Sequence, residues 1–108
     1  MVLNETKALG VLSAVLGPYV FDAGTMAGIH LTAIAGFSGT IALQVRHVGG
    51  LSGHWRTLKT WTALMTEAET FDPISESLEY QLIVTAYTSG SLMALIFGES
   101  NKLTPAIN

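Results

Sequence analysis

The chain has 108 residues, which fits one domain with a single modest core and leaves no room for a separate catalytic domain. Charged residues make up only 12% of it and apolar residues 49%, so we expect association to hide part of an apolar surface. A monomer with a threonine-rich surface is the alternative. The net charge is −3 and the five basic residues are scattered, which argues against nucleic-acid binding. Cysteine is absent, which excludes disulfides and thiolate metal sites.

The sequence leaves the secondary structure of residues 1–20 open, because the apolar run at 8–16 fits a short helix or a strand equally well. We expect an ordered N-terminal arm or first strand here, followed by a single domain over 21–108. No apolar run approaches the roughly 20 residues of a membrane-spanning helix, so we predict no membrane partner. Lys7 is the only basic residue near this run and no small-residue cleavage site follows, so we also predict no secretion signal.

From about residue 25 onward the apolar residues recur with a period of two, which is typical of strands. The pattern predicts strands over 29–34 and 41–46, separated by a break at 36–39 and followed by a glycine-rich loop at 49–53. Aromatic and β-branched residues predict a strand over 55–61, and a weaker strand covers 66–71. Five or six strands without helical periods between them predict an all-β fold, an antiparallel β-sandwich or small barrel of jelly-roll or immunoglobulin-like type.

The last two apolar runs, 80–88 and 91–97, flank Ser89-Gly90, a sequence that favours a two-residue hairpin turn. Pairing across that turn predicts one core face, made of Leu82, Val84, Met93, Leu95 and Phe97. The opposite face holds four more apolar residues, Ile83, Tyr87, Leu92 and Ile96. A solvent-facing sheet surface is normally polar, so either a segment such as 8–21 or another subunit must cover this face. We predict these four residues as a subunit interface.

No assembled catalytic or metal site emerges from the titratable and nucleophilic residues. His47 and His54 bracket the glycine-rich loop without an acidic residue between them, and His30 fits an outward strand position. The carboxylates fit solvated surface positions, and neither Ser38 nor Ser52 lies in a nucleophile-elbow motif. We therefore expect a chain that is not an enzyme and that uses no metal and no cofactor.

Trp55 and Trp61 lie an even number of residues apart on one predicted strand, so both can project from the same face of a β-sandwich. Exposed tryptophans in this arrangement often form a glycan-stacking platform, which keeps a carbohydrate-binding module open as an alternative function. Burial of tryptophan against the core is the commoner outcome, and we favour it here.

Two stretches of the chain carry a family resemblance. They are Phe37-Ser38-Gly39-Thr40-Ile41-Ala42-Leu43-Gln44, followed after the glycine-rich loop by Trp55, and Tyr80-Gln81-Leu82-Ile83-Val84-Thr85-Ala86-Tyr87-Thr88-Ser89-Gly90-Ser91. Together they resemble small virion structural proteins of tailed bacteriophages over roughly residues 36–97. The loop before Trp55 is longer than in that pattern, and Gln81 stands where a basic residue is usual.

The resemblance implies a capsid decoration or cement protein that stabilises the phage head by packing between subunits. Its partners would be the major capsid protein, other copies of itself in a homo-oligomer such as a trimer, or both. It would be made in the host cytoplasm and end on the head surface of the virion, with residues 1–20 reaching a neighbour. A head–tail connector or tail component is the nearest alternative, since the same fold serves either place.

Overall fold

The computed structural model describes residues 2–62, 66–75 and 77–100, and these residues form one six-stranded, all-antiparallel sheet. In chain order the elements are β1 (Val2–Leu9), β2 (Val15–Tyr19), β3 (Ala27–His47), the short 3-10 helix η1 (Ser52–His54), β4 (Arg56–Thr62), β5 (Thr66–Phe71) and β6 (Leu78–Glu99). The predicted all-β, antiparallel fold class is therefore confirmed. The predicted strand over 66–71 matches β5, and β4 lies within one residue of the predicted strand over 55–61.

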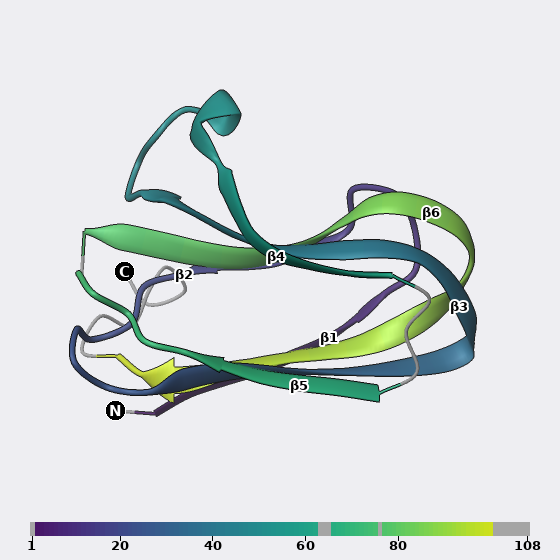
Figure 1. Cartoon of the computed structure of the whole chain (residues 1–108), viewed down its shortest axis with the longest axis horizontal. Coiled ribbons are helices and arrows are strands. Elements are labelled where there is room, and N and C mark those ends of the chain that lie inside the picture. Colours follow the sequence, from purple (N-terminus) through teal and green to yellow (C-terminus); the bar gives the residue numbers. More distant parts are fainter. Residues whose placement is uncertain (1, 63–65, 76, 101–108) are drawn as a thin grey trace.

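Two long strands organise the sheet. β3 has 21 residues and β6 has 22, and they pair from Gly28 opposite Phe97 to His47 opposite Leu78. The ribbon that they form bends in its middle, so that one half of it lies over the other (Figure 1). β1 and β5 flank one half and make the lower layer, in the order β1-β6-β3-β5, while β2 and β4 flank the other half and make the upper layer, β2-β6-β3-β4. The sandwich is thus a single sheet folded over on itself.

The bend lies where the sequence predicted a break and a hairpin turn. Gly36 and Gly90 adopt φ of 66° and 78°, a left-handed conformation that glycine takes without steric cost. The register between β3 and β6 shifts between Ile34 and Ser38 and again before Ile41, as expected of bulges that bend a strand. The predicted hairpin at Ser89-Gly90 is therefore wrong, because the same positive φ serves a bend inside one continuous strand, β6.

The core lies between the two layers. Its largest fully buried side chains come from both halves of the ribbon and from the segments beside it: Leu9, Phe21, Ile29, Leu31, Ile41, Leu82, Val84, Leu92 and Ile96. At the end away from the bend, the Phe71 ring lies 5.8 Å from Phe21 and 4.9 Å from Tyr80, measured between ring centroids. Residues 2–19, for which the sequence left arm, helix and strand open, supply β1 and β2 and pack on this chain's own core.

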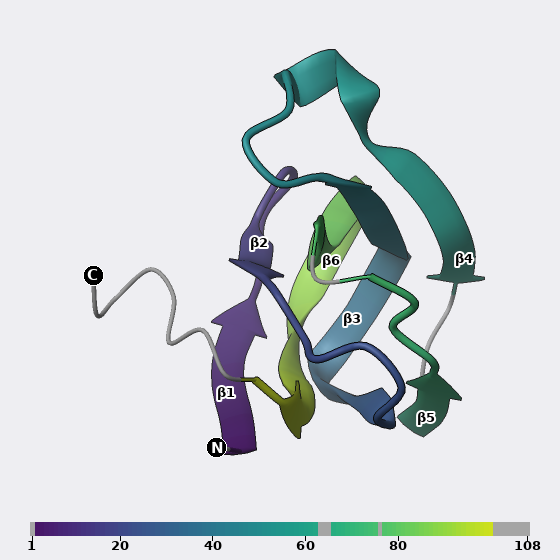
Figure 2. The same ribbon diagram turned by 90° about the vertical axis from the view of Figure 1, so that its left-hand side faces the viewer.

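On each side of the sandwich, one polar contact joins the edge strands of the two layers. Figure 2 shows β1 and β2 on one side and β4 and β5 on the other. Lys7 Nζ on β1 donates a hydrogen bond of 2.9 Å to the carbonyl oxygen of Val15 on β2. On the opposite side, Lys59 Nζ on β4 lies 2.9 Å from Glu69 Oε1 on β5. These exposed contacts link the layers where the described residues form no backbone ladder.

The close approach of the strands at the bend predicts a strong effect of one added methyl group. A Cβ at Gly39 would collide with the backbone carbonyl oxygen of Ala86 on the paired strand, whereas a Cβ at Gly53 meets no heavy atom of the described residues within 4 Å. We expect Gly39→Ala to lower the free energy of unfolding by about 1–3 kcal/mol, because the backbone must shift. Gly53→Ala, the matched control, should leave it unchanged or raise it by up to about 1 kcal/mol. Urea denaturation measures both, and equal stabilities of the two variants would contradict the bend geometry.

Candidate functional site

The outer surface of the lower layer carries no formal charge over three consecutive rows of cross-strand neighbours. Residues directly opposite each other on antiparallel strands project to the same side, so the register defines the rows. The rows are Asn4-Phe97-Gly28-Thr70, Thr6-Leu95-His30-Ala68 and Ala8-Met93-Thr32. We call these residues the uncharged face, since none of them is Lys, Arg, Asp or Glu. Glu99 is the next outward residue along β6, so the uncharged face ends there, at the end of that strand.

An apolar stripe from β6 runs along the middle of the uncharged face. Met93 is 37% exposed, and Leu95 and Phe97 are half-buried. Ile34, 41% exposed, continues the apolar surface toward the bend. The flanking strands add small or neutral polar side chains, so the face offers a broad surface with little to hold water.

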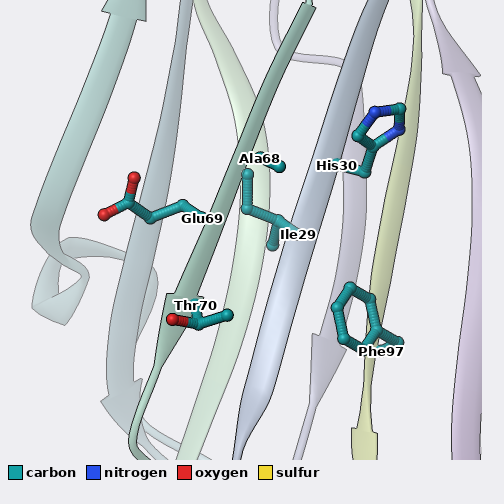
Figure 3. A pocket seen from close by; sticks show the side chains of 6 residues that line it. All are labelled: Ile29, His30, Ala68, Glu69, Thr70 and Phe97. Carbon is teal, nitrogen blue, oxygen red and sulfur yellow. The ribbon is translucent and has the colours of Figure 1, made fainter.

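The uncharged face is hollowed beside its central strands. An open cavity of about 520 Å³ is lined by Ile29, His30, Ala68, Glu69, Thr70 and Phe97. Glu69 stands opposite the inward-facing Ile29, its carboxylate is paired with Lys59, and it extends away from His30 and Phe97 (Figure 3), so it is not part of the uncharged rows. Figure 3 shows the rings of His30 and Phe97 beside β3, with Ala68 and Thr70 on β5 across from them. The Phe97 ring lies over Gly28, where any larger residue would displace it. His30 Nδ1 lies 3.5 Å from Thr32 Oγ1, so its imidazole is held along the strand.

The outer surface of the upper layer, built from the other halves of the same two strands, has the opposite character. Arg46 Nε donates to Glu79 Oε2 at 2.7 Å, and the Arg46 guanidinium lies 4.3 Å from the centroid of the Trp55 ring. Beside this pair, Gln81 Nε2 donates to Gln44 Oε1 at 3.0 Å, and Gln44 Nε2 donates to Thr57 Oγ1 at 3.3 Å. The upper surface thus has the polar cross-strand contacts expected of a sheet that faces water.

The difference between the two surfaces identifies the candidate site. A solvent-facing sheet surface normally alternates with polar and charged residues, and the upper layer follows that rule. The uncharged face departs from it on neighbouring stretches of the same strands. Depletion of charged residues with retained aromatic and Met side chains is the composition of a protein–protein contact surface. It is the surface of this chain best suited to bury itself against another protein.

The four residues predicted as a subunit interface do not share one surface. Leu92 and Ile96 are fully buried in the core at 0% exposure, so assigning them to an interface was wrong. Ile83 is half-buried on the upper outer surface, opposite Ala42 and Val15. Tyr87 is 36% exposed at the bend, where its hydroxyl donates to the Gly90 carbonyl oxygen at 3.0 Å.

The physical reason for this error is the bend. Because β6 continues through the bend at Ser89-Gly90 as one strand instead of turning back, its even-numbered residues point inward in both halves. Met93, Leu95 and Phe97 therefore point outward instead of into the predicted core. In the run from Leu92 to Phe97, the odd-numbered and the even-numbered residues are both apolar. Periodicity alone therefore does not show which set faces the core. The fully buried partner of Leu92 in the register, Leu9 on β1, decides the inward side.

The two tryptophans do not form the glycan-stacking platform that was considered. Trp61 is 6% exposed and belongs to the core, as the favoured interpretation held, with Lys59 Nζ 5.6 Å from its ring centroid. Trp55 is half-buried and its ring is covered by Arg46. A pair of coplanar exposed rings for sugar binding is therefore not available.

Two tyrosines, Tyr19 and Tyr80, have a raised pKa. Burial raises the pKa of Tyr80, and a hydrogen bond with the Ile74 backbone acts in the opposite direction. Burial also raises the pKa of Tyr19, and the nearby Glu5 carboxylate raises it further. Within residues 2–62, 66–75 and 77–100, no three His, Asp or Glu side chains gather as a potential metal site. The same part of the chain contains no helix with the length and apolar character needed to cross a membrane.

Comparison with known proteins finds remote likeness only. No protein-family model matches the chain, and no curated protein matches it. Among solved structures, the chain is similar to the crystal structure of PirA, with a TM-score of 0.44 and 15% sequence identity over 89% of this chain and 92% of that one. It is also similar to a structure from Bacillus endospore appendages, described as a family of disulfide-linked pili, with a TM-score of 0.38 and 14% identity over 92% and 89% of the two chains. At these scores neither likeness carries an argument about function.

The inward and outward positions on β6 predict opposite effects for two neighbouring residues. We expect Leu92→Ala to lower the free energy of unfolding by about 2–5 kcal/mol, because it leaves a cavity in the core. Met93→Ala, one residue further along the strand and facing outward, should change it by less than about 1 kcal/mol. Chemical denaturation followed by circular dichroism compares the two variants. A larger loss for Met93→Ala would show that the two faces of β6 are assigned the wrong way round.

Proposed function

We propose that this chain is a non-enzymatic structural subunit that functions by packing its uncharged face against protein. The observation that carries this proposal is the contrast between the two outer surfaces, one with paired polar side chains and one without any formal charge. Large exposed apolar side chains elsewhere, such as Val2 at 64% and Ile74 at 78%, add to the surface that association would remove from water.

The occupant that we propose for the uncharged face is a second copy of this chain. A partner that presented charges there would lose their hydration without gaining an ion pair, which costs free energy. A chain of net charge −3 repels its own copies through charged surfaces, but two uncharged faces meet without that repulsion. A copy of the same face also supplies the apolar stripe on β6 with a matching stripe, as in the self-complementary contact of a two-fold dimer.

The finer part of the proposal is a role as a capsid decoration or cement protein on the head of a tailed bacteriophage. It rests on the sequence resemblance over roughly residues 36–97, which covers the second half of β3, the β3–β4 connection, β4, β5 and nearly all of β6. In this role, oligomers made through the uncharged face would lie over junctions between major capsid subunits. The protein would be made in the host cytoplasm and incorporated on the outside of the head.

The self-association can be tested with charges placed on the uncharged face. We expect the wild-type chain to sediment as an oligomer at micromolar concentration. Met93→Lys and Thr6→Lys should each shift it to the monomer, because two like charges are brought together in a contact with no anion to pair them. Leu58→Lys, at a position 53% exposed on β4 and outside the face, makes the same change of charge and should not alter sedimentation. Analytical ultracentrifugation at equal concentrations measures all four proteins.

Two results would contradict this proposal. A wild-type chain that stays monomeric would remove the second copy as the occupant, and an equal loss of oligomer in Leu58→Lys would remove the face. Thermal unfolding of each variant by circular dichroism separates lost association from lost folding.

The virion role has its own test, which is independent of self-association. Purified heads of a tailed phage that encodes this chain should contain it in a copy number comparable to that of the major capsid protein. Quantitative mass spectrometry of intact particles measures that ratio. A handful of copies per particle would instead indicate a head–tail connector or tail component, and absence from particles would refute the virion role while leaving the uncharged face untouched.

A further inference from the structure

A second cavity lies on the other side of the molecule, where the connection between β3 and β4 stands away from the upper layer. Figures 1 and 2 show this excursion, which carries η1, rising from the sheet. The cavity has a volume of about 540 Å³. The side chains that matter for its chemistry are Arg46, His47, His54, Trp55 and Arg56.

The cavity gathers an unusual share of the positive groups of this chain. The whole sequence has five Lys and Arg residues and three histidines, and two of each group line this one cavity. Among the residues that the structure describes, no Asp or Glu lines it. Because Glu79 pairs with Arg46, the positive charge of this cavity comes from Arg56, with His47 and His54 as neighbouring donors, in a protein of net charge −3.

The floor of the cavity is rigidly built. Arg46, whose side chain is 17% exposed, is fixed between the Glu79 carboxylate at 2.7 Å and the Trp55 ring at 4.3 Å. The connection above it is fixed by backbone hydrogen bonds, from Val48 to the Ser77 carbonyl oxygen at 2.8 Å and from His54 to that of Leu51 at 3.0 Å. The Arg46 floor and the backbone that carries His47 and His54 are therefore held in place before any ligand arrives, which lowers the entropy lost on binding.

The remaining basic groups are available to a ligand. Glu79 already neutralises Arg46, but in the part of the chain that the structure describes Arg56 makes no ion pair. Arg56, His47 and His54 are all exposed. A guanidinium offers a planar fork of donors that matches the oxygens of a carboxylate or phosphate, and imidazole nitrogens add further donors.

From these observations we infer that the cavity beneath the β3–β4 connection binds an anionic group, a carboxylate or phosphate, between Arg56 and the two histidines beside Trp55. The site is separate from the uncharged face and does not depend on the proposed function. The same oxyanion chemistry is offered by a free small anion and by the acidic side chains of a peptide, so the test includes both.

The experiment titrates the full chain with inorganic phosphate and, separately, with hexaglutamate, at constant ionic strength set with sodium chloride. Two-dimensional NMR follows the imidazole resonances of the three histidines and the indole resonance of Trp55. We expect saturable shifts at His47, His54 and Trp55, with His30 on the opposite layer unmoved as an internal control. Tighter binding of hexaglutamate would assign the site to an acidic peptide, and tighter binding of phosphate would assign it to a free oxyanion.

Two variants of equal charge make the test specific. Arg56→Gln removes the available guanidinium and should weaken binding about tenfold, the loss expected for one charge-assisted hydrogen bond. Lys7→Gln removes one positive charge from β1, where Lys7 bonds the Val15 carbonyl oxygen, and should leave the affinity unchanged. Absence of saturable shifts with both probes, equal shifts at His30, or equal weakening in the two variants would each overturn the inference.

Discussion

The continuous pairing of β3 with β6 is the constraint on which the rest of the structure depends. These two strands supply the inner strands of both layers, so the core, the bend and both outer surfaces follow from their register. Most pairs in the ribbon join residues far apart in sequence. This register can therefore form only once β6, the last strand of the chain, is available to pair with β3. β1, β2, β4 and β5 each add one short edge to a ribbon that already defines which side faces inward.

A folded ribbon gives one chain two outer surfaces of different chemistry. The half that carries Arg46 and Glu79 satisfies its polar groups within the sheet, so it remains stable in contact with water. In the half that carries Met93 and Leu95, the outward side chains that the structure describes form no ion pair, and apolar area is exposed instead. Separation of these properties onto opposite sides suits a subunit with one surface toward a protein neighbour and another toward solvent, which is the arrangement that the proposed structural role needs.

The sequence predicted the fold class and much of the strand pattern, because a period of two is a local property of residues 29–34 and 41–46. It did not predict how β6 continues, since Ser89-Gly90 supplies a positive φ that fits a hairpin turn and a bent strand equally well. The assignments after the turn failed with that choice, including that of Leu92 and Ile96 to an interface, whereas Leu82 and Val84 before it are core residues as predicted. The uncharged face was missed for a related reason, because its three rows join four strands whose pairing is set by long-range register.

Charged residues on the edge strands of the sandwich affect how copies of the chain can add to one another. Glu5 and Lys7 on β1, Glu67 and Glu69 on β5, and Lys59 on β4 occupy inward-facing positions at the borders of the layers. An ionisable side chain at such a position would be trapped, dehydrated, inside any continuous sheet that formed by adding a new strand at that edge. Strand addition at the edges formed by β1, β4 and β5 is thereby discouraged, which leaves the sheet faces as the surfaces for the proposed contact between copies.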